Sequence, residues 1–129
     1  MKKTSRSLIV LASFLIFFQN CKKENTSNIS LSVSLPNENQ EFLSGQTLAI
    51  KGTTSDESGL HTLTVEVTDD KTGAMLFVKK PTVLDLKTYN FDESWAVKVS
   101  DWTDATVKIT SINHNNQSVV KSLKVKLWL

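Results

Sequence analysis

The amino-acid sequence predicts an all-β domain, folded as an antiparallel β-sandwich of about seven strands. Apolar and polar residues alternate with a period of two through most of the chain after residue 28, as is typical of half-buried strands. Glycines and prolines stand at the junctions between these segments, and no window there has sustained helical spacing. Seven such segments in about 100 residues favour two packed sheets. The predicted strands are 29–35, 47–52, 62–68, 74–79, 94–99, 105–112 and 119–128.

The first two predicted strands each have one apolar face. In 29–35 every odd-numbered position is aliphatic and every even-numbered position is serine, and Pro36 ends the strand. A turn at Gly45 precedes 47–52, in which two aliphatic side chains share one face. We expect both segments to pack one face on the core and to expose the other.

The next two predicted strands form a hairpin. Aliphatic residues occupy the odd positions of 62–68 from 63 onward. The polar segment 69–73 follows and ends in a glycine, which is suited to the positive φ of a short turn. Segment 74–79 is then the return strand.

The last three predicted strands complete the domain. Segments 94–99 and 105–112 alternate apolar and polar positions, and polar residues 113–116 predict a turn before 119–128. The stretch 83–92 is ambiguous in its spacing, and we expect an irregular segment at a sheet edge.

The first 20 residues have the pattern of a secretory signal peptide. Three basic residues lie within the first six positions, and residues 8–18 are apolar except for Ser13. A membrane-spanning helix needs about 20 apolar residues, so this run is too short to remain as an anchor. A basic start followed by a short apolar core favours export and removal of residues 1–20.

Cys21, the single cysteine, lies directly after this segment. A lone cysteine in an exported protein is a free thiol, half of an intermolecular bridge, or a modified residue. The basic start, the apolar core and the cysteine together resemble the signal of bacterial lipoproteins, as found in Bacteroidetes. The resemblance implies a diacylglycerol thioether and an acylated amino group (palmitate, for example) on Cys21, and an anchor in the outer membrane of a Gram-negative bacterium. The alternative is an ordinary secretory signal with an incidental cysteine.

Residues 21–28 predict a tether between the lipid and the domain. They are polar apart from the cysteine and lack apolar periodicity, so they cannot bury surface and should be flexible. A single acidic residue, Glu24, follows two lysines, and this leaves both orientations open, facing the periplasm or the cell surface.

Four segments between the predicted strands resemble, in their order, the Ig-like domain of many bacterial surface proteins and lipoproteins. The resemblance covers residues 29–129 and implies a single Ig-like β-sandwich. Because its motifs are turn signals, it implies a fold and no activity. The segments are Leu35 to Asn37, Ser44 to Leu48, Thr54 to Leu60 and Ser111 to Asn116.

Charge and motifs argue against several classes of function. The net charge is +2, and without the first 20 residues 12 basic side chains stand against 13 acidic ones, which gives −1. This balance does not favour nucleic-acid binding. Neither His61 nor His114 lies in a catalytic context, no Gly-Xaa-Ser-Xaa-Gly motif occurs, and the histidine spacing suits no zinc site. We therefore predict a protein that is not an enzyme and has no cofactor or metal.

Two acidic loops are the predicted contact region for a ligand. One contains Asp56 and Glu57, and the other contains Asp101, Trp102 and Asp104. These residue types suit exposure better than burial, and loops on a rigid sandwich commonly carry its binding residues.

The same carboxylates suggest a calcium hypothesis. Alternate loops of a sandwich share an end, which predicts that Asp56, Asp92 and Asp101 approach one another and supply oxygen ligands. The alternative, that these acids only solvate their loops, is favoured because no calcium-loop consensus occurs.

The tryptophans suggest a second kind of ligand. Trp95 shares its phase with Val97 and is expected in the core. Trp102 stands in a loop beside acidic residues, where an exposed flat ring can stack on a sugar. Trp128 falls on the lysine-bearing phase of the last strand, so we expect it to face solvent or to cover the sandwich edge.

The sequence thus predicts a lipid-anchored, non-catalytic envelope protein whose Ig-like domain binds a protein or glycan partner. The alternatives are a small periplasmic or surface enzyme inhibitor, a carbohydrate-binding accessory module, and a small hydrolase. The absence of an acid–base pair at meaningful spacing favours the binding module over the hydrolase.

Overall fold

A computed structural model describes residues 28–129, and every structural statement below concerns that range. The predicted signal peptide, Cys21 and all but the last residue of the predicted tether lie outside the described residues. No helix in the described range is long and apolar enough to cross a membrane. The described residues form eight strands: β1 (Ser30–Leu35), β2 (Gln40–Leu43), β3 (Thr47–Ser55), β4 (Leu60–Asp69), β5 (Met75–Lys79), β6 (Thr88–Ala96), β7 (Thr103–Asn113) and β8 (Ser118–Trp128).

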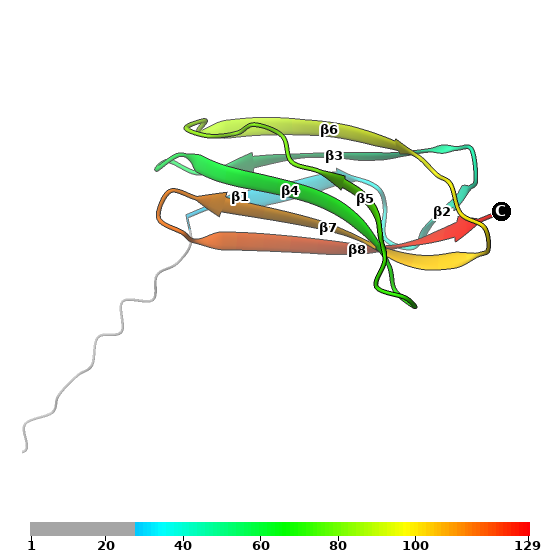
Figure 1. Cartoon of the computed structure of the whole chain (residues 1–129). Helices are drawn as coiled ribbons and strands as arrows, with labels where there is room; N and C mark the ends of the chain where they lie inside the picture. Colours follow the sequence, from blue (N-terminus) through cyan, green and yellow to red (C-terminus); the bar gives the residue numbers. More distant parts are fainter. Residues whose placement is uncertain (1–27) are drawn as a thin grey trace, which may run out of the picture.

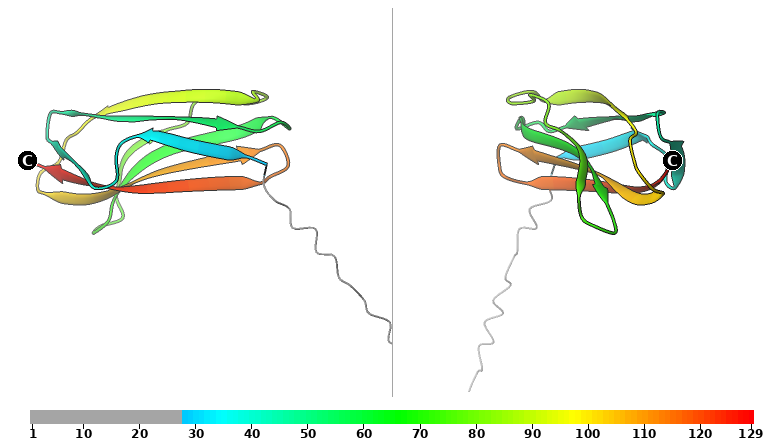
Figure 2. Two further views of the ribbon diagram at one scale, coloured as in Figure 1. Left: turned by 180° about the vertical axis from the view of Figure 1, so that it is seen from behind. Right: turned by 45° about the vertical axis from the view of Figure 1, so that its right-hand side comes forward.

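The strands form two sheets packed face to face (Figure 1). One sheet has the order β1-β3-β6, and the other has the order β2-β8-β7-β4-β5. The chain changes sheet after every strand except β4 and β7, so strands far apart in sequence lie side by side (Figure 2). This arrangement confirms the predicted all-β sandwich.

The inward faces of both sheets supply one aliphatic core. Val65, Val107 and Ile109 are fully buried on the five-stranded sheet, and Leu48 and Ile50 are fully buried on β3. Burial of one such side chain contributes about 1.5–3 kcal/mol. The aliphatic residues that alternate with polar ones in the sequence therefore form the contacts between the two sheets.

The structure has eight strands where the sequence predicted seven, because β2 was not recognised. Only Phe42 among its four residues is buried, so the segment is too short to show alternation. β2 also runs parallel to β8, whereas every other strand pair is antiparallel. The sequence predicted an antiparallel sandwich, and the β2–β8 pair is the one exception among the described strands.

The sixth strand also lies elsewhere than predicted. β6 includes the end of the stretch 83–92, which was predicted to be irregular, and it ends before the predicted boundary at 99. Half-buried Glu93 stands between Phe91 and Trp95 on the inward phase and interrupts the apolar alternation there. Because this inward position is polar, the alternation of apolar and polar residues did not predict the strand at its observed bounds.

The strand register places the turns at two opposite ends of the sandwich. In the pairing of β4 with β7, Leu60 lies opposite Asn113 and Asp69 lies opposite Ala105. The β3–β4 and β7–β8 turns therefore share one end, and the β4–β5 turn and β6–β7 loop share the other. We call the end with residues 56–59 and 114–117 the near end, and the end with residues 69–74 and 97–104 the far end.

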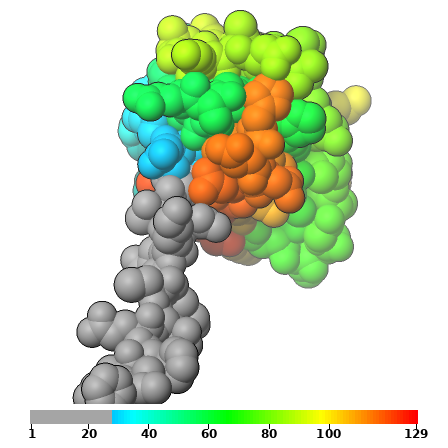
Figure 3. Space-filling model, turned by 90° about the vertical axis from the view of Figure 1, so that its left-hand side faces the viewer, coloured from blue at the N-terminus to red at the C-terminus, as the bar shows by residue number. Residues whose placement is uncertain are grey.

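The described chain starts at the near end and finishes at the far end. Ser30 at the start of β1 pairs with Ser55 at the end of β3, and Figure 3 shows the start of β1 beside the β7–β8 turn. The C-terminus lies at the opposite end of the sandwich (Figure 1). The two ends are separated by the length of β7 and β8, eleven residues each.

Candidate binding site at the far end

The structure separates the two loops that were predicted to form one contact region. Asp56 and Glu57 lie at the near end, whereas Asp101, Trp102 and Asp104 lie at the far end. Three strands, β4, β5 and β6, separate the two loops along the chain, and an odd number of strands places loops at opposite ends. The near-end and far-end residues therefore belong to different surfaces.

The same geometry removes the calcium hypothesis. Asp92 lies within β6, where its carboxylate pairs with Lys51 at 3.4 Å, and it meets neither Asp56 nor Asp101. Within residues 28–129 no three His, Cys, Asp or Glu side chains gather in a manner suited to a metal ion. The prediction that these three aspartates approach one another is wrong.

Asp56 at the near end is a structural residue. It is 4% exposed, and its carboxylate accepts hydrogen bonds from the Ser58 hydroxyl, the Ser58 amide (2.8 Å) and the Asn113 side-chain amide (3.0 Å). The Ser58 hydroxyl, followed by Asn113, holds the pKa of Asp56 below its ordinary value of 3.8, against the opposing effect of burial. Its oxygens are therefore engaged within the fold.

A second polar contact joins the two sheets beside Asp56. The hydroxyls of Thr54 on β3 and Ser111 on β7 are both fully buried and lie 2.7 Å apart. This bond joins the two sheets, and the bond from Asn113 of β7 likewise reaches across to Asp56, which directly follows β3. In the described range no buried side-chain nitrogen or oxygen lacks a partner. At the near end, buried hydrogen bonds therefore add to the aliphatic contacts between the two layers of the sandwich.

The two histidines also lie at the near end. Their ring centroids are 5.7 Å apart, and Nε2 of His114 lies 2.6 Å from a carboxylate oxygen of Asp85. Gly59, with φ at +98°, lies beneath the His114 ring, and a Cβ there would come within 2.8 Å of it. Among the described residues, the side-chain hydrogen bond of this pair joins His114 to Asp85, and neither ring is bonded to a hydroxyl group.

The far end presents two stacked tryptophans. Thr103, the first residue of β7, pairs with Leu127, which places Trp102 at the end of the β6–β7 loop opposite Trp128 of β8. Leu127 points into the core, so Trp128 points outward as its lysine-bearing phase predicted. The ring centroids lie 5.9 Å apart at an angle of 28°, and the residues are 55% and 37% exposed. This exposed pair is the tryptophan ledge.

Trp95, the third tryptophan, behaves differently. It is half-buried against the core, as its phase predicted, and stacks on Phe77 of β5 with 6.3 Å between ring centroids. Of the three tryptophans, only the two of the ledge are classed as exposed.

A groove of about 560 Å³ adjoins the ledge. Trp102 lines it on one side, with neighbouring residues 100–104, and the β4–β5 turn lines it on the other. The Asp70 amide donates to the Asp104 carbonyl (2.9 Å) and joins the turn to β7. Asp69 accepts from the amides of Lys71 (2.8 Å) and Thr72 (3.2 Å), and these bonds, led by that of Lys71, lower its pKa. Both walls are thus fixed by hydrogen bonds.

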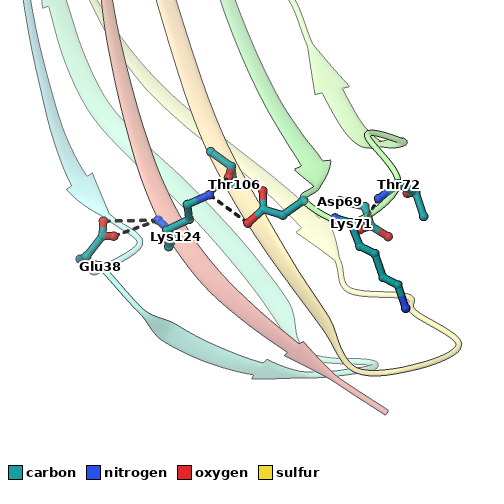
Figure 4. Close-up of polar contacts among 7 residues, drawn as sticks. Glu38, Asp69, Lys71, Thr72, Thr106 and Lys124 are labelled. Atoms are coloured by element: carbon teal, nitrogen blue, oxygen red, sulfur yellow. Dashed lines mark hydrogen bonds and ion pairs between the residues drawn. The ribbon is translucent and has the colours of Figure 1, made fainter.

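A polar network of residues from β7, β8 and the β1–β2 turn supports the β4–β5 turn (Figure 4). The ammonium of Lys124 pairs with Asp70 (2.9 Å) and donates to the Thr106 hydroxyl (2.8 Å), while its backbone amide donates to Glu38 (3.3 Å). The Thr106 hydroxyl in turn donates to Asp70 (2.5 Å). The charge of Asp70 is therefore already balanced within the protein.

Three carboxylates of the groove can accept further hydrogen bonds, because both bonds to Asp69 reach the same oxygen. Asp101 accepts one bond, from the Trp102 amide (2.8 Å), and the Asp104 side chain has no hydrogen bond or ion pair with the rest of the described chain. Both residues were predicted to be exposed, and Trp128 was predicted to face solvent or to cover the sandwich edge. The contributions of Lys71 and Thr72 were not predicted, because these residues reach the site only through the geometry of the β4–β5 turn.

Comparisons with known proteins concern the fold. No protein-family model matches the chain, and no curated protein matches it. Among solved structures, the fibronectin(III)-like modules of Clostridium thermocellum CbhA match with a TM-score of 0.50 and 10% identity, over 77% of this chain and 96% of that one. The fold is Ig-like. Murine CRIg matches with a TM-score of 0.47 and 10% identity, over 77% of this chain and 97% of that one.

Proposed function

We propose that the protein is a lipid-anchored, non-catalytic envelope protein whose Ig-like domain binds a protein or glycan partner at its far end. The exposed tryptophan ledge carries this proposal. Large exposed apolar surfaces with polar surroundings commonly mark interaction sites, and Trp is enriched where binding energy concentrates. The ledge also borders a groove with free carboxylates at Asp101 and Asp104.

The position of the proposed anchor supports the same assignment. Cys21 precedes Asn28, where the described chain begins, by seven residues. An extended segment of that length spans at most about 25 Å, and the chain enters the sandwich at the near end. A lipid on Cys21 would hold the near end toward the membrane and the far end away from it, which leaves the ledge open to a partner.

The chemistry of the groove favours binding over turnover. Its walls offer carboxylates, hydroxyls, an ammonium group and an aromatic ring. Both histidines of the described range lie at the other end of the sandwich, so no imidazole base stands beside a hydroxyl nucleophile in the groove. Anchoring near other envelope components raises their effective concentration, so a modest interface suffices.

Two variants of the full chain test the two halves of the proposal separately. Cys21→Ser should move the protein from the membrane to the soluble fraction of the producing cells and abolish incorporation of labelled palmitate. If the variant stays membrane-bound to the same extent, the proposal of a lipid anchor on Cys21 is wrong.

Trp102→Ala should leave the membrane fractionation unchanged. It should abolish both the capture of a partner from solubilised envelope and the binding of the protein to a glycan array. Retention unchanged by Trp102→Ala would show that the ledge is not the site.

A further inference from the structure

We infer that the far-end groove binds a neutral oligosaccharide, with one sugar ring stacked on Trp102 and its hydroxyl groups bonded to Asp101, Asp104 and Lys71. The inference rests on the proposed function and specifies its ligand. It depends on the aromatic wall, on the balance of charge in the groove, and on the dimensions of the groove.

The aromatic wall is held in place before any ligand arrives. Trp128 covers one face of Trp102 and is not itself part of the groove lining, while Trp102 remains 55% exposed beside the groove. The face of an indole ring is electron-rich, and it therefore attracts the polarised C–H groups on the flat side of a pyranose. Because Trp128 already restrains the ring, stacking costs little further side-chain entropy.

The charge of the groove and its rim comes to −1, with four carboxylates against three ammonium groups. Asp70 is paired with Lys124, whereas Asp69 accepts two backbone amides on one of its oxygens and keeps its charge. Asp69, Asp101 and Asp104 therefore stand against two further ammonium groups. Lys71 lines the groove, and Lys126 lies opposite Asp104 on β8 with no carboxylate of the described chain within 4 Å of it.

This balance selects against charged ligands. A cationic side chain drawn to Asp101 would meet Lys71, and an anionic ligand drawn to Lys71 would meet Asp101 and Asp104. A neutral polyhydroxyl ligand can use both kinds of group, because each hydroxyl donates to a carboxylate and accepts from an ammonium. The lining therefore suits a neutral glycan better than an acidic polysaccharide or a basic peptide.

The dimensions of the groove agree with this ligand. Its volume of about 560 Å³ lies within the range of about 300–1,000 Å³ typical of small-ligand sites. It is formed at the tip of the sandwich between two chain segments, the β4–β5 turn and the β6–β7 loop. A chain that continues beyond the stacked sugar can leave the groove without meeting the body of the domain.

Titration of the full chain with defined glycans tests the inference. The protein is solubilised in a detergent without a sugar headgroup, and its tryptophan fluorescence is followed with neutral hexasaccharides (cellohexaose, xylohexaose, mannohexaose and chitohexaose), hexagalacturonate, and an arginine-rich peptide beside its citrulline counterpart. We expect at least one neutral hexasaccharide to bind. Its affinity should change less than about twofold between low and high salt, since no net charge is screened. Trp102→Ala should weaken it at least tenfold, and Trp102→Phe should weaken it less.

Controls and opposing outcomes separate this inference from the proposed function. Asp92→Asn, on β6 away from the groove, should leave the affinity unchanged, whereas Asp101→Asn with Asp104→Asn should weaken it severalfold. Thermal unfolding of each variant establishes that it is folded. Binding of the arginine peptide but not of its citrulline counterpart, or of hexagalacturonate alone, overturns the inference and leaves a binding module in place. If none of the neutral glycans binds, the inference is wrong, and an envelope partner still retained through Trp102 would keep the proposed function.

Discussion

Replacement of Asp56 by alanine should destabilise the domain strongly although the residue lies in a turn. The carboxylate is 4% exposed and accepts three hydrogen bonds, from the hydroxyl and amide of Ser58 and from the side chain of Asn113. A hydrogen bond to a charged group contributes about 1.5–3 kcal/mol, and removal of one partner leaves buried donors unsatisfied. Because Ser58 can turn to solvent and Asn113 keeps its bond to Gln117, we expect a total loss of about 2–3 kcal/mol rather than the full sum. In a domain of this size that loss lowers Tm by roughly 10–20 °C.

The dependence of this loss on pH tests its cause. The pKa of Asp56 is lower in the folded protein than its ordinary value of 3.8. The stabilisation is therefore fully present above pH 3.8 and is lost as the pH falls through the lower folded value. Urea unfolding of the parent and of Asp56→Ala should thus give free energies of unfolding that differ at pH 7 and converge in acid. Glu57→Ala, at the exposed neighbouring carboxylate, is the matched control and should have little effect. A loss below about 0.5 kcal/mol at pH 7, the range of ordinary surface substitutions, would refute the reasoning.

Three further predictions concern the fold. Val65→Asp should leave the domain unfolded by circular dichroism at 25 °C, because an unpaired charge at a fully buried position has no compensation; a cooperative native transition would contradict this. Gly59→Ala should cost about 1 kcal/mol more in urea unfolding than Gly45→Ala, because both have positive φ but only Gly59 lies against a side chain; equal losses would remove the steric argument. Thr54→Val should cost about 1–3 kcal/mol by leaving the Ser111 hydroxyl buried without its partner, and the double variant with Ser111→Ala should cost less than the two losses added.

Much of the fold is encoded in local alternation, and the exceptions have local causes. The predicted strand 29–35 agrees with β1 to within one residue because its serines and aliphatic residues alternate without interruption. β2 escaped prediction because a single buried residue, Phe42, makes no pattern, and its pairing with β8 joins segments far apart in sequence. β6 was misplaced because Glu93 occupies an inward position. The sequence also supports a signal peptide and lipidation at Cys21, which stay predictions because those residues lie outside the described range.

The candidate site was predicted residue by residue but not as an assembly. The acidic neighbours of Trp102 indicated its exposure, and the lysine phase of β8 indicated that Trp128 points outward. That the two rings stack depends on the register of β7 and β8, which the turn between them determines and which a one-residue slip would destroy. The separation of Asp56 from Asp101 could have been obtained from the count of intervening strands. The bonds from the turn amides to Asp69 and the ion pair of Asp70 with Lys124 could not have been predicted in this way.

The two ends of the sandwich differ in how their polar groups are used, and this difference determines where a ligand can bind without cost to the fold. At the near end the carboxylate of Asp56 and the hydroxyls of Thr54 and Ser111 are bonded within the domain, so a ligand that recruited them would break contacts between the sheets. At the far end Asp101 and Asp104 can accept further hydrogen bonds while every internal contact stays intact. Replacement of these near-end groups should therefore change stability before it changes binding. Replacement of Asp101 and Asp104 should change binding and leave stability nearly unaltered, because within the described chain the Asp101 side chain accepts a single bond and the Asp104 side chain accepts none.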